Sequence, residues 1–262
     1  MKIKTVGDMD KPFIIMLPGS FCQSSALAYL YEKLQDNYCI ILPEYNGHYA
    51  NSIFTTRQNE AKDITDHLKS QNIAHIKMIY GQSMGAEVGI ELYRQLLENH
   101  ITVDHCFLDG APCIKLSSMY KKVMYLKFKM MINMLRGKSV DEALNLKILK
   151  KLSGGDTEKL RPMIEPLVAS APILTEESIK KETECCYTFD FPAFDEAAQK
   201  KMYFFYGEDE KAYKTCYNGV KKAYPSANYK VVAGYGHLTY SIKNTGDYID
   251  RIKSICERNI ST

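Results

Sequence analysis

The stretch from Ile76 to Ala86 reads Ile-Lys-Met-Ile-Tyr-Gly-Gln-Ser-Met-Gly-Ala. A short apolar run leads into Gly-x-Ser-x-Gly, and a helical pattern of small residues follows at once. This order predicts a strand, a sharp turn that carries Ser83, and a helix. The turn strains the serine backbone, so the chain needs nearly bare positions on either side, which Gly81 and Gly85 supply. The hydroxyl would then lie at a helix N-terminus, which favours developing negative charge.

Length and composition fit one large α/β domain. The chain has 262 residues, of which 45% are hydrophobic and 25% charged, and these values are ordinary for a globular protein. A net charge of +3 and the lack of a basic stripe with interleaved aromatics give no reason to expect a nucleic-acid partner. No apolar run reaches the roughly 18 residues of a membrane span. The segment Met1–Asp8 has no apolar core of signal-peptide length, so we expect a cytoplasmic protein.

The eight cysteines do not indicate a metal centre or a disulfide framework. No Cys-x-x-Cys occurs, and the adjacent Cys185 and Cys186 lack the spacing of zinc ligands. Cys39 and Cys106 lie in apolar runs, where free cysteine behaves as a small hydrophobe. We therefore expect reduced thiols and no metal. Nothing resembles a dinucleotide-binding fingerprint, so we expect no cofactor.

Apolar runs alternate with helical patterns along the first part of the chain, which predicts a mostly parallel central sheet flanked by helices. The expected strands are 13–17, 39–43, 76–80, 106–108, 202–206 and 229–233. The expected helices are 24–34, 58–70, the segment from Ser83 to about 98, and 246–258.

The pattern changes between 114 and 198, where helical stretches broken by prolines replace the strands. Because strands resume after this segment, we interpret 114–198 as a helical cap inserted into a core formed by 1–113 and 199–262. Basic residues far outnumber acids between Lys115 and Lys151, and methionines alternate there with Leu and Phe.

Two interpretations of this cap segment are open. One is a flexible apolar lid with a basic rim, which would admit acyl chains that carry an anionic head. The other, which we favour, is an amphipathic helix whose Met/Leu stripe is core and whose lysines face solvent. Either one suits an apolar acyl group better than a sugar.

A serine hydroxyl is a weak nucleophile and needs a base that a carboxylate orients. Among the six histidines, His237 stands out because it lies just beyond the last apolar strand. The other five fit turns, a polar helix or the ends of elements: His48, His67, His75, His100 and His105.

The carboxylate is harder to assign from the residues. The strand at 202–206 runs into an acidic turn, Glu208-Asp209-Glu210. Asp109, at the end of the strand at 106–108, is a further candidate.

Acyl transfer creates an oxyanion, which needs two backbone N–H donors fixed in advance. One candidate is the N–H of Met84, immediately after the serine. The other is the N–H of Ser20, in the loop that leaves the strand at 13–17. The alternative for that loop is a plain Pro-Gly turn.

From about Phe13 to Ile255 the chain resembles the α/β-hydrolase superfamily, specifically its small single-domain members with a cap. The segments that carry the resemblance are Leu17-Pro18-Gly19-Ser20, Gly81-Gln82-Ser83-Met84-Gly85, Gly207-Glu208-Asp209-Glu210 and Gly236-His237. The resemblance implies the chain order nucleophile, acid, base.

Three positions depart from the family pattern. Members usually show Gly-x-x-Asp at the acid turn, which maps the catalytic acid onto Glu210 and leaves Asp209 as the alternative acid. The usual His-Gly of the oxyanion loop is Pro18-Gly19 here. The segment Glu44–His48 resembles the family's Asp-x-x-Gly-x-Gly turn, with Glu in place of Asp.

Together these residues indicate a serine hydrolase that cleaves a carboxylic ester or thioester of a small or acyl-chain substrate through an acyl-enzyme on Ser83. An acyltransferase would use the same residues. The same scaffold could also belong to a non-catalytic protein that only binds a ligand. A lyase that uses the three residues as a base is a third hypothesis. The serine disfavours haloalkane dehalogenase and epoxide hydrolase chemistry, which need an aspartate at the same position.

Overall fold

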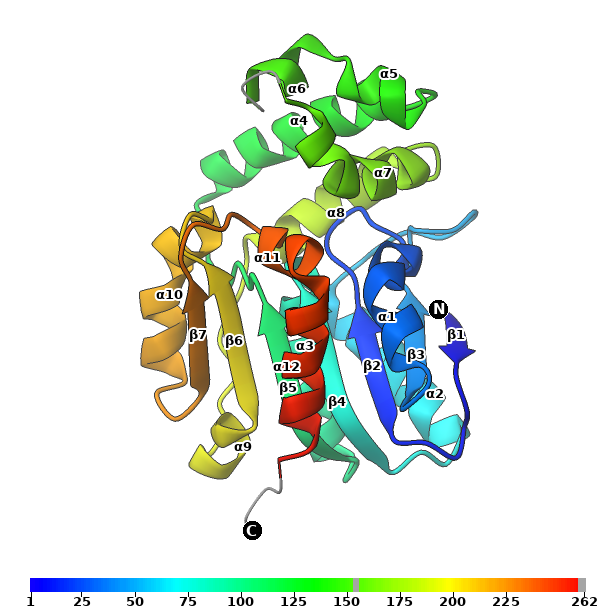
Figure 1. Ribbon diagram of the computed structural model, residues 1–262, viewed down its shortest axis with the longest axis vertical. Helices are drawn as coiled ribbons and strands as arrows, with labels where there is room; N and C mark the ends of the chain where they lie inside the picture. The colour runs from blue at the N-terminus through cyan, green and yellow to red at the C-terminus, as the bar shows by residue number, and fades with distance from the viewer. Residues whose placement is uncertain (153–155, 259–262) are drawn as a thin grey trace.

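A computed structural model describes residues 1–152 and 156–258 and shows a seven-stranded sheet (Figure 1). The strands are β1 (Lys2–Val6), β2 (Phe13–Leu17), β3 (Cys39–Glu44), β4 (His75–Gln82), β5 (Thr102–Asp109), β6 (Met202–Gly207) and β7 (Asn228–Val232). They lie in the order β1-β3-β2-β4-β5-β6-β7, and every neighbouring pair is parallel except β1 with β3. The predicted mostly parallel sheet is confirmed.

The edge strand β1 is the strand that the sequence pattern did not reveal. It pairs antiparallel with β3, with Lys2 opposite Glu44 and Val6 opposite Ile40. Its residues are exposed or half-buried, and lysines on such an edge discourage further strand pairing. By contrast, β2 is buried along nearly its whole length. Strands that are covered on both faces are continuous apolar runs in the sequence, and β2 could be predicted for this reason.

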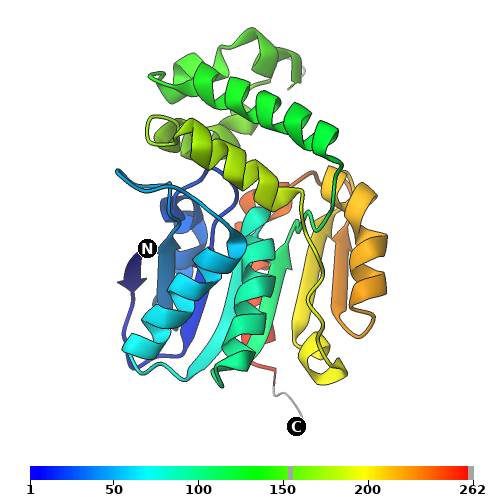
Figure 2. The ribbon, with the colours of Figure 1, turned by 180° about the vertical axis from the view of Figure 1, so that it is seen from behind.

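Helices cover both faces of the sheet (Figures 1 and 2). On one face lie α1 (Ala28–Leu34) and α12 (Thr245–Cys256), and on the other α2 (Arg57–Ser70), α3 (Met84–Glu98) and α10 (Lys211–Ala223). Each face has its own cluster of buried apolar side chains. The helices predicted at 58–70, after Ser83 and at 246–258 are confirmed. The helix predicted at 24–34 begins with a 3-10 turn, Ser24–Leu27, and α10 and the short α11 (Thr239–Lys243) were not predicted.

A helical insertion separates β5 from β6 and lies over one end of the sheet (Figure 1). Its helices there are α4 (Ser118–Leu135), α5 (Val140–Leu144), α6 (Lys147–Leu152), α7 (Arg161–Ser170) and α8 (Glu176–Cys186). They share a third apolar cluster, which includes Ile132 and Leu174 and takes in Phe21 from the core. The last helix before β6, α9 (Glu196–Lys200), lies at the opposite end of the sheet (Figure 2). The helical insertion is confirmed, and its boundaries at 114 and 198 stay a prediction.

The favoured interpretation of the Met/Leu stripe of α4 as core is wrong for three of its residues. Ile132 and Leu135 are buried in the cap cluster, as a core stripe requires. Met119, Leu126 and Met130, however, are 70%, 53% and 53% exposed. The helix is apolar on more of its circumference than its neighbours α7 and α8 cover, since these three side chains stay exposed.

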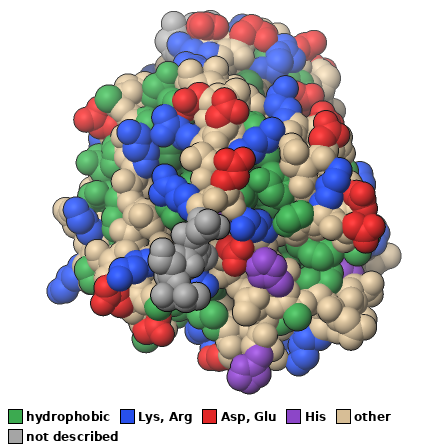
Figure 3. Space-filling model, turned by 60° about the horizontal axis from the view of Figure 1, so that its bottom comes forward, with side chains coloured by type: hydrophobic (Ala, Val, Ile, Leu, Met, Phe, Trp, Pro, Cys, Tyr) green, Lys and Arg blue, Asp and Glu red, His purple; other side chains and the backbone are tan. Residues whose placement is uncertain are grey.

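Further expectations from the sequence concern the cysteines, membrane-spanning helices and the charge of the surface. All eight cysteines are free, as expected. No helix in the described part of the chain is both long and apolar enough to cross a membrane. Basic and acidic side chains are interspersed on the face shown in Figure 3, so no stripe of one sign forms there.

Candidate active site

Ser83 lies between the end of β4 and the start of α3, at the predicted sharp turn. Its backbone has φ 53° and ψ −121°, a conformation that non-glycine residues adopt only when the surrounding structure holds them in it. The Ser83 N–H donates a 2.8 Å hydrogen bond to the carbonyl of Asp109. A Cβ on Gly81 would collide with the carbonyl of Gly85, and a Cβ on Gly85 would collide with the carbonyl of Leu17. Both glycines are therefore required by close backbone approach.

His237 contacts Glu210 and neither of the other candidate acids. The His237 Nδ1 lies 2.5 Å from Glu210 Oε2. The other carboxylate oxygen of Glu210 accepts a 2.8 Å hydrogen bond from the Gly207 N–H. Glu210 is only 2% exposed, whereas the His237 side chain is one-third exposed. A buried carboxylate that is bonded on both oxygens holds the imidazole in one orientation and one tautomer.

The two alternative acids have other partners. Asp209 is exposed, and its nearest charged partner is Lys214 at 3.8 Å. Asp109 is buried and accepts a 2.5 Å hydrogen bond from the Tyr248 hydroxyl. Burial raises the pKa of Asp109 to about 7, and the Tyr248 bond opposes that rise. Neither of these carboxylates is bonded to His237.

The serine and the His–Glu pair lie at the same end of the sheet, beneath the cap. Ser83 follows β4, Glu210 follows β6 and His237 follows β7, so all three lie beyond the carboxyl ends of parallel strands. In open α/β sheets this is the edge where ligands bind. The end of β5 contacts both the serine and the histidine. The Asp109 carbonyl accepts the hydrogen bond from the Ser83 N–H, and a Cβ on the next residue, Gly110, would lie 2.6 Å from His237 Cε1.

The Ser83 hydroxyl itself has no hydrogen-bond partner among the described residues. It is partly exposed, and Gly19 of the loop after β2 approaches it so closely that a Cβ there would lie 3.5 Å from Ser83 Cβ. Catalytic hydrogen bonds in ligand-free sites are often long and tighten only with substrate.

The two expected oxyanion donors lie in segments next to Ser83. Met84 is the first residue of α3, and Ser20 lies in the loop after β2 next to Gly19. Within the described ranges, neither the Met84 N–H nor the Ser20 N–H has an acceptor. The Ser20 hydroxyl lies 3.2 Å from the Cys186 thiol of α8, so the cap contacts this loop directly.

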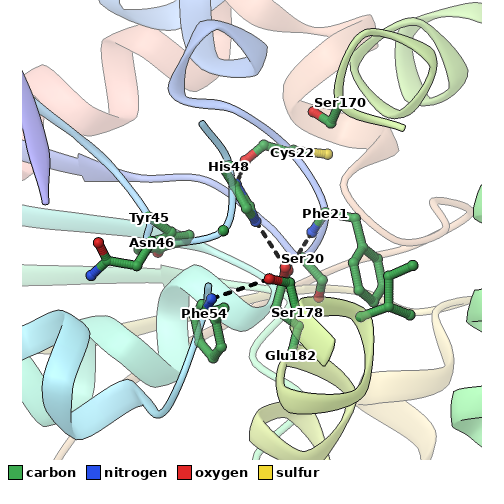
Figure 4. A network of polar contacts seen from close by, with 12 residues as sticks. Ser20, Phe21, Cys22, Tyr45, Asn46, His48, Phe54, Ser170, Ser178 and Glu182 are labelled. Carbon is green, nitrogen blue, oxygen red and sulfur yellow. Dashed lines mark hydrogen bonds and ion pairs between the residues drawn. The ribbon is translucent and has the colours of Figure 1, made fainter. Parts of the chain in front are cut away.

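Sequence reasoning missed a second polar network, between the cap and the loop after β2 (Figure 4). His48, expected to be an ordinary turn residue, is fully buried and its Nε2 lies 2.9 Å from Glu182 Oε1 of α8. The other Glu182 oxygen accepts a 2.7 Å hydrogen bond from the Phe21 N–H. No local pattern pairs His48 with Glu182. The only available signal was the position of His48 directly after the Glu44–Gly47 turn.

Across residues 1–152 and 156–258, no group of three or more His, Cys, Asp or Glu side chains is placed to hold a metal ion. The chemistry available at the site is that of a serine, an imidazole, a buried carboxylate and free backbone N–H groups.

Of the comparisons with known proteins, the one with solved structures shows the architecture. No family model matches the sequence, and no curated protein is recognisably related to it. Solved structures match over nearly the whole chain. An α/β-hydrolase family protein from Desulfitobacterium hafniense is 19% identical, with a TM-score of 0.72 over 97% of this chain and 99% of that one. The chain has the α/β-hydrolase fold.

Other members of this fold include proteins described as esterases. An esterase from a marine microorganism is 17% identical, with a TM-score of 0.70 over 97% of this chain and 98% of its own. A carboxylesterase from the thaumarchaeon Nitrososphaera gargenis is 16% identical, with a TM-score of 0.70 over 97% and 94% of the two chains. The α/β-hydrolase fold is thus clear, while identities this low leave the reaction to be argued from the site.

Proposed function

We propose that this α/β-hydrolase-fold protein is a serine hydrolase that cleaves a carboxylic ester or thioester. The observation that carries the proposal is the buried Glu210 carboxylate bonded to His237, at the same sheet edge as Ser83 in its strained turn. A pair of this kind supplies a base of fixed orientation next to a presented nucleophile. Two of the solved structures with the same fold are described as esterases, which supports the same reaction class.

In the proposed reaction, the Ser83 hydroxyl attacks the carbonyl carbon of the substrate while His237 Nε2 takes its proton. The Glu210 carboxylate stabilises the imidazolium. The N–H groups of Ser20 and Met84 donate to the carbonyl oxygen as it becomes an oxyanion. When the tetrahedral intermediate collapses, the bond to the alcohol or thiol breaks and His237 returns the proton to that leaving group.

Water then completes the cycle. His237 takes a proton from water, whose oxygen attacks the acyl carbon, and the proton returns to Ser83 as the acid product leaves. The acyl group enters beneath a cap whose cluster is apolar, which favours an aliphatic or aromatic acyl part over a sugar. Transfer to an acceptor other than water would use the same steps until this last one.

The first test is covalent labelling by a fluorophosphonate, followed by intact mass. We expect one adduct on the wild-type protein, no adduct on Ser83→Ala, and an unchanged adduct on the control Ser254→Ala, whose serine is exposed on α12. A panel of esters and thioesters of increasing acyl length then gives the substrate class, and added alcohols reveal acyl transfer. If folded wild-type protein gives no adduct, the site binds a ligand without acyl chemistry.

A further inference from the structure

Glu182 connects the cap to the loop that carries Ser20. It lies on α8, its side chain is fully buried, and its two carboxylate oxygens contact two different parts of the core (Figure 4). One oxygen accepts from the Phe21 N–H at 2.7 Å and the other lies 2.9 Å from His48 Nε2. Phe21 has a φ of 62°, a left-handed conformation that a bulky residue adopts only under constraint.

The partners of His48 determine where its protons are. Its Nδ1 lies 2.8 Å from the carbonyl of Cys22, and a carbonyl can only accept, so Nδ1 carries a proton. The contact from Nε2 to the Glu182 carboxylate needs a further proton. The imidazole ring of His48 thus carries a proton on each nitrogen, and His48 and Glu182 form an imidazolium–carboxylate pair.

The surroundings favour this charged pair. Burial, the largest single effect, would lower the pKa of His48. The Glu182 carboxylate, Glu44 and the Cys22 carbonyl together outweigh burial, and the pKa of the ring is raised above its usual value. Two further acids from other elements act on the ring: Glu44 of β3, 3.9 Å from Nδ1, and Glu60 of α2. The nearby Cys22 thiol is neutral, because burial raises its pKa to about 12. The Tyr45 ring packs edge-on against the imidazole.

We infer that Glu182 is a positioning residue: together with the protonated His48, it holds the Phe21 N–H, and by fixing the residue that follows Ser20 it keeps the Ser20 N–H directed at the oxyanion. This inference rests on the proposed function for the role of Ser20, whereas the hold on Phe21 is a property of the structure itself. Phe21 also packs its ring against Phe128 of α4, 5.1 Å between centroids. A shift of the cap would therefore be transmitted to the oxyanion loop.

Two substitutions of Glu182 distinguish a role in positioning the loop from a role in packing alone. In Glu182→Gln, the amide oxygen can still accept from Phe21 and the amide NH₂ can donate to an unprotonated His48 Nε2. The network then survives without the second proton. In Glu182→Ala, both bonds are lost. The matched control is Glu184→Gln, a half-exposed acid on the same helix that pairs with Lys181.

The first measurement is amide hydrogen exchange of peptides that span Ser20 to Cys22. We expect at least tenfold faster exchange in Glu182→Ala, and near wild-type exchange in Glu182→Gln and Glu184→Gln. Unchanged exchange in Glu182→Ala would overturn the inference, whatever the protein catalyses.

The second measurement is the fluorophosphonate labelling rate of Ser83 across pH. Loss of one oxyanion donor costs about 10²–10³-fold, so we expect a slowing of at least tenfold in Glu182→Ala and recovery of most of the rate in Glu182→Gln. The wild-type rate should fall again at alkaline pH, where His48 loses its second proton, and this fall should be absent in Glu182→Gln. An equal fall of the labelling rate at alkaline pH in wild type and in Glu182→Gln would overturn the role of the protonated His48. An unlabelled wild type would refute the proposed function and leave hydrogen exchange to decide the hold on Phe21.

Discussion

Glu210 and Asp209 are adjacent, yet the turn after β6 gives them opposite environments. Glu210 is the N-cap residue of α10 and its carboxylate is directed inward, where it is bonded to Gly207 and His237. Asp209 is directed outward to solvent and Lys214.

This contrast predicts the catalytic acid. Glu210→Gln should reduce the rate of Ser83 labelling by about 10³–10⁴-fold, because the imidazole loses its orienting carboxylate and the favoured tautomer. Asp209→Asn should stay within a few-fold of wild type. Second-order labelling rates at one pH compare the two, and equal losses would remove Glu210 from its assigned role.

Glu87 is a second residue whose environment is unusual. It lies on α3 one turn after Ser83, is fully buried, and neither of its carboxylate oxygens has a partner in the described part of the chain. Burial raises its pKa to about 8, and the charge of Arg57 opposes the rise. The folded state therefore holds this proton more tightly than the unfolded chain, whose value is 4.5, and stability falls as the pH rises between those values.

Glu87→Gln should remove this pH dependence. We expect the unfolding free energy of the variant, minus that of wild type, to grow by about 1 kcal/mol or more between about pH 5 and about pH 8. Urea unfolding at both pH values measures it. The control is Glu91→Gln, which changes a buried acid of the same helix that has a partner, since Glu91 is bonded to Arg94 at 2.6 Å. A constant difference for Glu87→Gln would contradict the prediction.

At the scale of elements, the packing of α3 against the sheet sets the position of Ser83. The helix begins immediately after the serine, and its first turn approaches the carbonyl of Leu17 at the end of β2 too closely for any side chain at Gly85. Gly219, in contrast, lies in an exposed part of α10, where an added Cβ would meet no atom within 4 Å. Two helical glycines therefore serve different purposes.

Alanine at these glycines should have opposite effects. Gly85→Ala should destabilise the protein by about 2 kcal/mol or more, because backbone cannot move aside as a flexible side chain can. Gly219→Ala should stabilise it by about 0.5–1 kcal/mol, the usual gain from replacing a helical glycine. Chemical denaturation measures both, and stabilisation by Gly85→Ala would contradict the close approach.

At the scale of the whole molecule, three apolar clusters divide the chain. Two lie on the faces of the sheet and the third lies within the cap, joined to the core through Phe21. A cluster with its own buried side chains can open without the sheet, because local unfolding follows the units that share contacts. The cap therefore has the means to move while the site residues on the strands stay in place.

Removal of a cap side chain should act locally. Ile132→Ala should speed amide exchange in α4, α5 and α7, with the strands β4 and β5 unchanged, whereas Ile79→Ala in the sheet cluster should lower global stability by about 2–5 kcal/mol. Hydrogen exchange by mass spectrometry resolves the two responses. Equal acceleration in the cap and the strands of Ile132→Ala would show that the clusters unfold as one unit.

The sequence by itself determined the buried parallel strands of this protein and the strand-turn-helix that presents Ser83. Buried parallel strands are continuous apolar runs, and the glycines of the turn mark a backbone that no other residue fits, so both features are written in neighbouring residues. The edge strand β1 escaped because it is only half covered. The second oxyanion donor and the base could be proposed only because both follow recognisable strands.

Only the tertiary structure decided which acid contacts His237, which half of the α4 stripe is covered, and that Glu182 bonds to His48 from 134 positions away. Adjacent acids in a turn look alike in sequence, and their orientation depends on the strand ends that the turn meets. Burial and long-range hydrogen bonds are set by how distant segments pack together, and the order of neighbouring residues does not contain that information.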